Sequence, residues 1–326
     1  MELLLYENAY ARVRDRLKEI APAVEPVTMR ADGSLSRAGQ TIPPEATRPE
    51  IAWASADLLV GGPTRDFMIF CLKSDSIRWL QSGAAGFDHP IFAQLAGKGI
   101  RLTNSNAAAV AISEFVLASV LEVYQTTDKR RDDQAQKMWV RRPFREIAGT
   151  TWLIVGIGNI GGEVAKRARA FGAHVVGVRR NPDGTEPADE TTTPDRLPGI
   201  LPRADVAVLA APANDGTERL VDRSFLLAMK PDSVLVNIAR GALIDEAALL
   251  ESLGKGRPGH AILDVFETEP LAETSPLWVH PQVHVTPHAA AMSDGTRNRG
   301  DLVFLENLKR YLDNGTLQFE VALTSA

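Results

Sequence analysis

The stretch TWLIVGIGNIGGEVAKRARAFGAHVVGVRR, residues 151–180, decides the fold of this chain. It begins with an apolar strand, predicted over Trp152 to Val155, and continues with a glycine-rich turn and a helical segment. Gly156, Gly158 and Gly161 form the pattern G-x-G-x-x-G directly after that strand. A tight bend, close approach to a pyrophosphate and close helix packing each exclude a side chain at these positions. The pattern predicts a dinucleotide-binding site, with the phosphates at the N-terminus of the helix.

A second strand, predicted over His174 to Val178, ends in two arginines, Arg179 and Arg180. In NAD sites this position usually carries an acidic residue that binds the ribose 2′-hydroxyl. Guanidinium groups instead match the oxygens of a 2′-phosphate. We therefore expect NADP as the cofactor, with NAD as the alternative if the two arginines are only solvated surface side chains.

The composition is typical of a soluble enzyme with more than one domain. The chain has 326 residues, of which 44% are hydrophobic and 24% charged, and a formal net charge of −5. Because Lys and Arg are scattered, we expect no nucleic-acid or membrane partner. With no signal-peptide pattern and no long apolar run, we expect a cytoplasmic protein. The single Cys71 is expected to be a buried structural thiol.

Two series of strands and helices predict two α/β domains. The first series has a helix over Glu7–Ile20 and strands near Leu58–Gly61, Ile77–Gln81 and Ile100–Asn104. After a long apolar helix over Ile112–Tyr124, the later strands of the second series are expected near Val206–Ala210, Ser233–Asn237, Ala261–Val265 and Val283–Val285. An irregular loop is expected over Asn181–Pro198, which is rich in proline and polar residues.

A final amphipathic helix, predicted over Gly295 to Leu312, makes the first domain discontinuous. Its apolar stripe, expected to pack on the first domain, is Leu302, Val303, Leu305, Leu308 and Leu312. We therefore expect residues 1–107 and 293–326 to form the substrate domain. Residues 108–292 are expected to form the dinucleotide-binding domain.

Three segments resemble the signatures of the D-isomer-specific 2-hydroxyacid dehydrogenases. They are LVNIARGALIDEAAL at 235–249, ILDVFETEPL at 262–271 and VTPHAAA at 285–291, in the family's order and spacing. WLQSGAAGFDHP at 79–90 is similar to the family's substrate loop, and PANDGT at 212–217 to its P-L-T-x-x-T turn. The resemblance implies a doubly wound Rossmann dinucleotide-binding domain and a smaller, flavodoxin-like α/β substrate domain.

Arg240 follows a strand at the carboxyl edge of the predicted sheet, where open α/β sheets bind their ligands. A guanidinium can bind the planar carboxylate of a 2-oxo acid through two hydrogen bonds and polarise the adjacent carbonyl. We expect Arg240 to bind substrate. Asp245, a few residues further on, is expected to cap the following helix.

His288 is the candidate proton donor, because reduction of a ketone needs an acid that titrates near neutral pH. Among the six histidines it alone occupies a catalytic position of a family motif. Glu269 is similar to the family's catalytic acid, since it stands directly before the proline, whereas Glu267 is expected to be solvated. A carboxylate bonded to the imidazole would favour the imidazolium and fix its tautomer. No spacing groups the histidines with other ligands, so we expect no metal site.

The resemblance also implies contacts to cofactor and substrate. Asp264 is similar to the family's contact to the nicotinamide carboxamide, with a strand cap as the alternative. Ala85 and Gly86 lie in a loop of small residues whose N–H groups would bind the substrate carboxylate. The further cofactor contacts that the resemblance implies are Asn159, Ile160, Ala211, Pro212, Thr217, Ile238 and Ala239.

The activity implied is NADP(H)-dependent reduction of a small 2-oxo acid, such as glyoxylate or hydroxypyruvate, to the D-2-hydroxy acid. The alternatives are NAD-dependent oxidation of a D-2-hydroxy acid and a dinucleotide-sensing, corepressor-like binding protein. Oxidation of formate or phosphite is disfavoured, because relatives with those activities carry Gln in place of Glu269 or Lys in place of Ala85. Residues 124–147 resemble the arm through which family members dimerise, so we expect a homodimer unless this segment is a plain surface helix.

Overall fold

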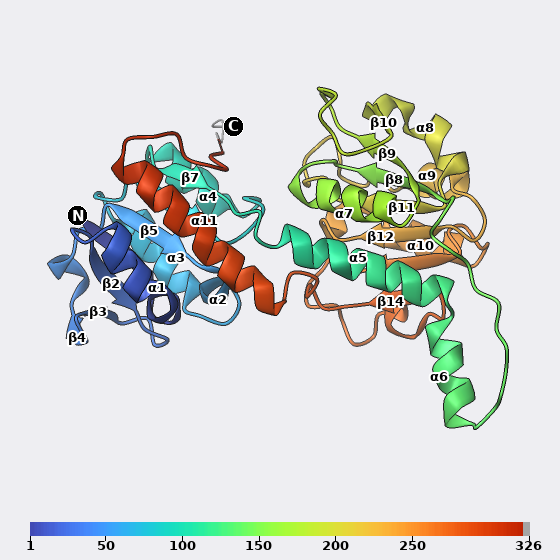
Figure 1. Cartoon of the computed structure of the whole chain (residues 1–326), viewed down its shortest axis with the longest axis horizontal. Helices are drawn as coiled ribbons and strands as arrows, with labels where there is room; N and C mark the ends of the chain where they lie inside the picture. The colour runs from blue at the N-terminus through green and yellow to red at the C-terminus, as the bar shows by residue number, and fades with distance from the viewer. Residues whose placement is uncertain (322–326) are drawn as a thin grey trace. The chain divides into compact units, whose positions relative to one another are not determined.

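The computed structural model describes residues 1–321. The described chain divides into two compact units, the first made of residues 1–108 and 293–321 and the second of residues 109–292. Each unit has its own sheet, as Figure 1 shows. Each sheet has seven strands. The expected α/β fold with two parallel-rich sheets is therefore confirmed.

The sheet of residues 109–292 is parallel throughout. Its strands are β8 (Thr151–Val155), β9 (His174–Val178), β10 (Glu190–Thr192), β11 (Val206–Leu209), β12 (Val234–Asn237), β13 (His260–Leu263) and β14 (Val283–Val285). Their spatial order, β10-β9-β8-β11-β12-β13-β14, extends the doubly wound dinucleotide-binding order by one strand. The prediction of an irregular loop over Asn181–Pro198 was wrong for residues 190–192, which form β10. It was also wrong toward its end, where Pro194–Arg196 form a 3-10 helix and Leu197 begins a further helix.

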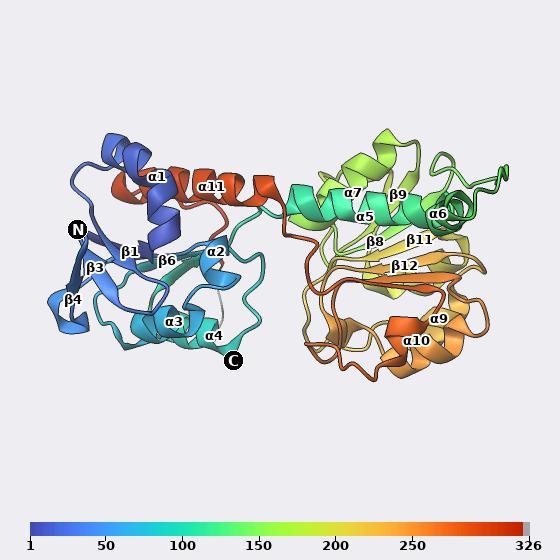
Figure 2. The same ribbon diagram turned by 90° about the horizontal axis from the view of Figure 1, so that it is seen from below.

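Helices cover both faces of this sheet. The helices are α5 (Ala109–Tyr124), α6 (Thr127–Ala135), α7 (Asn159–Ala170), α8 (Leu197–Ile200), α9 (Arg223–Ala228) and α10 (Glu246–Leu253). In Figure 2, α5 and α7 lie on one face and α9 and α10 on the other. With both faces covered, the strands must be apolar throughout; β8, β11 and β12 accordingly have almost no exposed residue.

The other unit has the flavodoxin-like order β2-β1-β5-β6-β7 in its parallel part, with β3 and β4 added antiparallel at one edge. The strands are β1 (Glu2–Tyr6), β2 (Glu25–Met29), β3 (Leu35–Arg37), β4 (Gln40–Ile42), β5 (Ile51–Ala54), β6 (Trp79–Ser82) and β7 (Arg101–Thr103). The helices are α1 (Glu7–Ile20), α2 (Ala56–Leu59), α3 (Thr64–Lys73), α4 (Pro90–Gly97) and α11 (Asp294–Leu312). Figure 2 shows α1 and α11 on one face of the sheet and α3 and α4 on the other.

The last helix, α11, completes the core of this unit, where Phe304 stacks on Trp53 with ring centroids 4.1 Å apart. The predicted apolar stripe was wrong at Leu302, which is 47% exposed. At 100° per residue, Leu302 lies off the face that Leu305 and Leu308 share, and Phe304 occupies the core instead. The strand predicted near Leu58–Gly61 was also wrong, because residues 56–59 form the helix α2. Such a short apolar run does not distinguish a strand from a buried helical turn.

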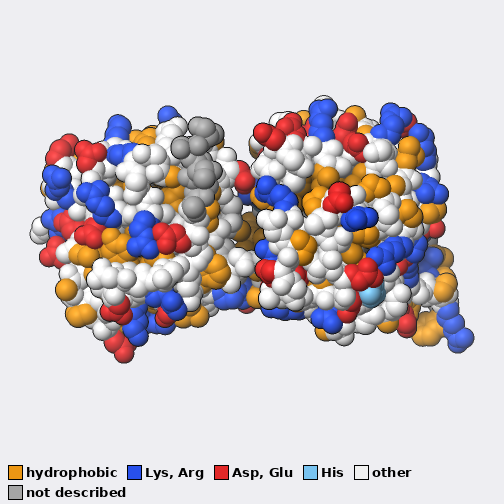
Figure 3. All heavy atoms as spheres, turned by 90° about the horizontal axis from the view of Figure 1, so that it is seen from above, with side chains coloured by type: hydrophobic (Ala, Val, Ile, Leu, Met, Phe, Trp, Pro, Cys, Tyr) orange, Lys and Arg blue, Asp and Glu red, His pale blue; other side chains and the backbone are white. Residues whose placement is uncertain are grey.

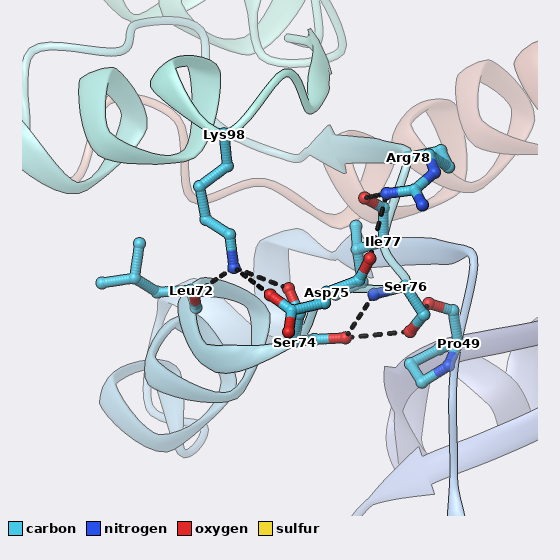
Figure 4. Close-up of polar contacts among 8 residues, drawn as sticks. All are labelled: Pro49, Leu72, Ser74, Asp75, Ser76, Ile77, Arg78 and Lys98. Atoms are coloured by element: carbon cyan, nitrogen blue, oxygen red, sulfur yellow. Dashed lines mark hydrogen bonds and ion pairs between the residues drawn. The ribbon is translucent and has the colours of Figure 1, made fainter.

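Lys98 satisfies backbone carbonyls that the end of α3 leaves without helical partners (Figure 4). Its Nζ donates to the carbonyl oxygens of Leu72 and Ser74 at 2.7 and 2.8 Å, and to the Asp75 carboxylate at 3.3 Å. The last carbonyls of a helix need such donors, and the cation also complements the helix dipole. Cys71, on the same helix, is fully buried as expected, and burial raises the pKa of its thiol.

Acidic and basic side chains are interspersed on the visible face of each unit in Figure 3. Among the described residues, no single helix is long and apolar enough to cross a membrane. The helices α5 and α6 meet the length and composition criteria only as a pair, and that pair is bent by 59°.

Candidate active site

The predicted catalytic and cofactor residues of the second unit follow the carboxyl ends of its parallel strands. The Gly156 turn follows β8, Ala211 follows β11, Arg240 follows β12, Asp264 follows β13 and His288 follows β14. In a parallel sheet these ends share one edge, which is the ligand-binding edge of open α/β folds. The fold therefore gathers these residues at one edge of the sheet.

His288 and Glu269 form a hydrogen-bonded pair. The Nδ1 atom of His288 lies 2.8 Å from Oε2 of Glu269, whose other oxygen accepts the backbone N–H of Phe266 at 3.1 Å. Both side chains are partly exposed, so the imidazole remains accessible. Because Nδ1 faces the carboxylate, Nε2 is the nitrogen left to meet a ligand.

The loop that carries His288 is fixed by Asp264. The Asp264 carboxylate accepts hydrogen bonds from the Thr286 hydroxyl at 2.6 Å and from the N–H groups of Ala289 and Ala290 at 2.8 and 3.0 Å. Its backbone carbonyl accepts the His288 N–H at 2.8 Å. His288 thereby keeps a left-handed backbone conformation, with φ of 52°. The geometry assigns Asp264 a supporting role; its contact to a nicotinamide stays a prediction.

Arg240 lies in a turn that Asn237 organises. The fully buried Asn237 side chain donates to the Arg240 carbonyl at 2.9 Å and accepts the Ala239 N–H at 3.1 Å. The Arg240 guanidinium donates to the Ala239 carbonyl at 2.6 Å through Nη1. Asp245 accepts the Ala248 N–H at 2.9 Å and caps α10, as expected.

Gly241 lies where the turn that carries Arg240 packs against the loop that follows β13. A Cβ atom at Gly241 would lie 1.8 Å from the Phe266 carbonyl carbon and 2.3 Å from the Glu267 nitrogen. Only glycine permits this approach of two backbones.

Glu267, predicted to be solvated, is exposed. Its carboxylate accepts a hydrogen bond from the Glu246 N–H at 3.4 Å.

The glycine-rich turn fits a dinucleotide pyrophosphate. Gly156 has φ of 95°, and a Cβ there would lie 2.5 Å from the Ala211 nitrogen. A Cβ at Gly161 would lie 2.1 Å from the Gly156 carbonyl oxygen, whereas one at Gly158 would meet no atom within 4 Å. The first and third glycines thus serve packing, and the second leaves space beside the N-terminus of α7, where Asn159 and Ile160 begin the helix.

The remaining predicted residues fall into three groups. Thr217 closes the turn after β11, since its hydroxyl donates to the Pro212 carbonyl at 2.7 Å. Ile238 and Ala239 are buried between β12 and Arg240. Ala85 and Gly86 belong to the other unit, in the loop after β6, where the Asn104 amide donates to the Ala85 carbonyl at 2.8 Å.

Arg179 and Arg180 directly follow β9, as expected, but the surroundings of the two side chains differ from each other. Nη1 of Arg179 donates to Glu186 at 2.9 Å and to Asp183 at 3.1 Å. Arg180 is exposed. Sequence reasoning did not anticipate these acids, and it also missed Asn237 and Gly241. The signature quoted for residues 235–249 contains both residues. Asn237 bonds within its own turn, whereas Gly241 meets Phe266, which is distant in sequence.

A model of the D-isomer specific 2-hydroxyacid dehydrogenase NAD-binding domain matches residues 117–290, more than half of the chain. The chain belongs to this dehydrogenase family. Its family is one of NAD(P)-dependent oxidoreductases, and the expectation drawn from the three signature segments is confirmed. Within the described residues, no group of three or more His, Cys, Asp or Glu side chains is arranged to hold a metal ion.

Relatives of this chain differ in length and in the reaction for which they are named. D-3-Phosphoglycerate dehydrogenase of Methanocaldococcus jannaschii is 29% identical over 74% of this chain and 46% of its own length. (S)-Sulfolactate dehydrogenase of Chromohalobacter salexigens is 33% identical over 62% of this chain and 67% of its own. Glyoxylate/hydroxypyruvate reductase A of Yersinia enterocolitica is 29% identical over 60% of this chain and 62% of its own length. The chain thus spans about half of the phosphoglycerate dehydrogenase.

Solved structures match nearly the whole chain. A D-isomer specific 2-hydroxyacid dehydrogenase family protein of Aeromonas salmonicida has a TM-score of 0.79 and 28% identity, with 98% of each chain covered. A dehydrogenase of Xanthobacter autotrophicus, solved in complex with NADPH and MES, has a TM-score of 0.76 and 25% identity, again over 98% of each chain.

Proposed function

We propose that this dehydrogenase reduces a small 2-oxo acid to the D-2-hydroxy acid with NADP(H), and catalyses the reverse oxidation. The observation that carries the proposal is the 2.8 Å contact of His288 with Glu269, at the sheet edge that also carries Arg240. An acid–base pair beside an always-charged guanidinium suits a substrate with a carboxylate next to a carbonyl.

His288 is the proposed proton donor. Its Nδ1 is held by Glu269, so Nε2 of the imidazolium delivers the proton to the carbonyl oxygen, and in the reverse direction the neutral Nε2 accepts it. Glu269 stabilises the positive charge on the ring and keeps it oriented. Arg240 binds the substrate carboxylate and polarises the carbonyl. When bound, the dinucleotide supplies the hydride from C4 of its nicotinamide.

The preference for NADP rests on the presence of arginine after β9, at the position where NAD sites carry the acid that binds a ribose hydroxyl. The Xanthobacter relative that was solved with NADPH supports it. Gly156, Gly158 and Gly161 would receive the pyrophosphate. Ala85 and Gly86 stay proposed contacts of the substrate carboxylate.

Glyoxylate and hydroxypyruvate are the proposed substrates. The similarity to the Yersinia reductase named for these two compounds supports this choice. Both compounds are small, and both carry the carboxylate and carbonyl that Arg240 is proposed to bind.

A homodimer is the proposed assembly. The segment after α6 exposes Met138, Trp139, Val140 and Phe144, and Trp139 is 95% exposed. Large apolar side chains grouped on one segment mark a protein interface more often than a free surface. Analytical ultracentrifugation of the wild type and of Trp139→Ser tests this assembly: a dimer that the variant weakens supports it, and a wild-type monomer overturns it.

Steady-state oxidation of NADPH and NADH with glyoxylate, hydroxypyruvate, pyruvate and phenylpyruvate tests the proposed reaction. We expect turnover with NADPH that Arg240→Ala abolishes and that Arg223→Ala, which removes an exposed arginine paired with Glu251, leaves unchanged. A wild type inert with every oxo acid would overturn the proposal and favour a binding role. Faster turnover with NADH would overturn only the NADP preference.

A further inference from the structure

Glu186 folds the loop after β9 back onto Arg179. Its side chain is only 1% exposed. One carboxylate oxygen accepts hydrogen bonds from Nη1 of Arg179 at 2.9 Å and from the Asp183 N–H at 3.0 Å. The other oxygen accepts a hydrogen bond from the Gly184 N–H at 2.9 Å. The loop that borders the proposed ribose site is therefore built around a buried carboxylate.

Asp183 adds a second carboxylate to the same guanidinium. Its Oδ2 accepts Nη1 of Arg179 at 3.1 Å, while Oδ1 accepts the Thr185 N–H at 3.0 Å and the Thr185 hydroxyl. The hydrogen bond from the Asp183 N–H holds the pKa of Glu186 below its usual range, so Glu186 is ionised at neutral pH. Two negative charges thus face Arg179.

Arg180 lies in different surroundings. It is exposed, and within residues 1–321 its guanidinium makes no hydrogen bond or ion pair with another side chain. The charges of Arg179 and Arg180 are balanced by those of Asp183 and Glu186. A phosphate dianion that approached Arg179 would meet two carboxylates, which repel it.

We propose that Glu186 is a specificity-determining residue that withholds Arg179 from the 2′-phosphate, so that Arg180 alone selects NADP(H) and NAD(H) is also accepted. This inference rests on the proposed cofactor site. Glu186 acts through Arg179 and touches no reacting atom, so it is a positioning residue. The opposite possibility, that Glu186 presents Arg179 to the phosphate, predicts the opposite effect of removing its charge.

Isothermal titration of the full chain with adenosine 2′,5′-bisphosphate and with 5′-AMP tests the inference without any turnover. Glu186→Gln keeps an acceptor for the loop N–H groups and removes the charge. We expect it to bind the bisphosphate about 3- to 10-fold tighter, the scale of a partly exposed ion pair, and to bind 5′-AMP as the wild type does. Glu251→Gln is the control, since it removes a carboxylate paired with another arginine on the same unit.

Arg180→Ala is expected to lose most of the preference for the bisphosphate, and Arg179→Ala to lose less. Unchanged or weaker bisphosphate binding by Glu186→Gln would overturn the inference, as would equal losses in the two arginine variants. If neither nucleotide binds, both the cofactor site and the inference fail. If both bind but no oxo acid is turned over, only the proposed reaction fails.

Discussion

The Asp264 carboxylate holds the backbone N–H groups on the C-terminal side of His288, and its carbonyl holds the N–H of His288 itself. Asp264, directly after β13, thereby fixes His288, which follows the neighbouring strand β14. The Glu269 carboxylate, on the loop after β13, then orients the imidazole. One inter-strand loop thus supplies both the support and the partner of the proposed acid.

Replacing Glu269 by Gln should slow reduction. A hydrogen bond to a charged group contributes about 1.5–3 kcal/mol, which corresponds to roughly 10- to 150-fold in kcat. The kcat of wild type and variant with glyoxylate and NADPH checks this, and the Tm of each protein controls for folding. A variant with the kcat of the wild type would indicate that Glu269 only packs against the ring.

Asp264→Ala should impair both stability and turnover. It leaves the Thr286 hydroxyl and two backbone N–H groups without their acceptor. Of these donors the Ala290 N–H is buried, and a buried unsatisfied group costs about 1–3 kcal/mol. Calorimetry should show a lower Tm, and kcat should fall even where the protein remains folded. A variant with normal Tm but a raised KM for NADPH alone would instead favour the predicted nicotinamide contact.

Gly241→Ala should lower kcat/KM and Tm together. The added Cβ would overlap the Phe266 backbone, so the turn that carries Arg240 must move. Gly199→Ala is the matched control, because a Cβ there meets no atom within 4 Å. The control should be neutral or slightly stabilising. If both variants behave alike, the close approach at Gly241 does not position Arg240.

Arg12 of α1 links the last helix, α11, to the helix α2 of the same unit, and we expect it to stabilise this unit. Its guanidinium binds Asp301 of α11 at 2.8 Å through Nε and Asp57 of α2 at 2.8 Å through Nη1. Arg12→Met should lower the unfolding free energy by about 1.5–3 kcal/mol, measured by urea denaturation. Arg14→Ala, which removes only an exposed pair with Asp15 on the same helix, should change it little. Equal effects would contradict a fastening role.

The Asp205 carboxylate should make stability depend on acid pH. Burial raises its pKa, but Lys230, the Thr151 N–H and Arg145 outweigh burial, so the pKa lies below its usual value. The unfolded carboxyl takes up a proton first, at about pH 4, so stability is complete above that pH and falls as the pH drops toward the folded pKa. Asp205→Asn should therefore be much less stable than wild type at pH 7, with a narrower difference at pH 3. A constant difference would refute this coupling.

Much of the dinucleotide-binding unit follows from local sequence. The strand and glycine pattern at 151–180 predicts β8, the turn and β9, because a parallel strand buried on both faces reads as an unbroken apolar run. The strand over Val283–Val285 is likewise found where it was predicted. The first unit was harder to predict. None of the strands β1 to β5 was anticipated, and Leu58 was placed in a strand although it lies in α2.

The support of the site could not be predicted from local sequence. Asn237 acts within its own turn, but Gly241 meets Phe266, and Asp264 meets the loop after β14, through pairs that only the folded sheet brings together. The contacts in the loop after β9 could not be predicted from local sequence either. Its sequence shows two arginines and two acids, but their pairing depends on how Glu186 is buried.

Chiral analysis of the product formed from hydroxypyruvate and NADPH tests the central claim most directly. We expect the wild type to form D-glycerate in step with NADPH oxidation, and His288→Asn to lose about 10²- to 10⁴-fold of that rate, the usual contribution of a general acid. L-Glycerate as the product, or a His288→Asn variant as fast as the wild type, would contradict the proposed roles of His288, Glu269 and Arg240.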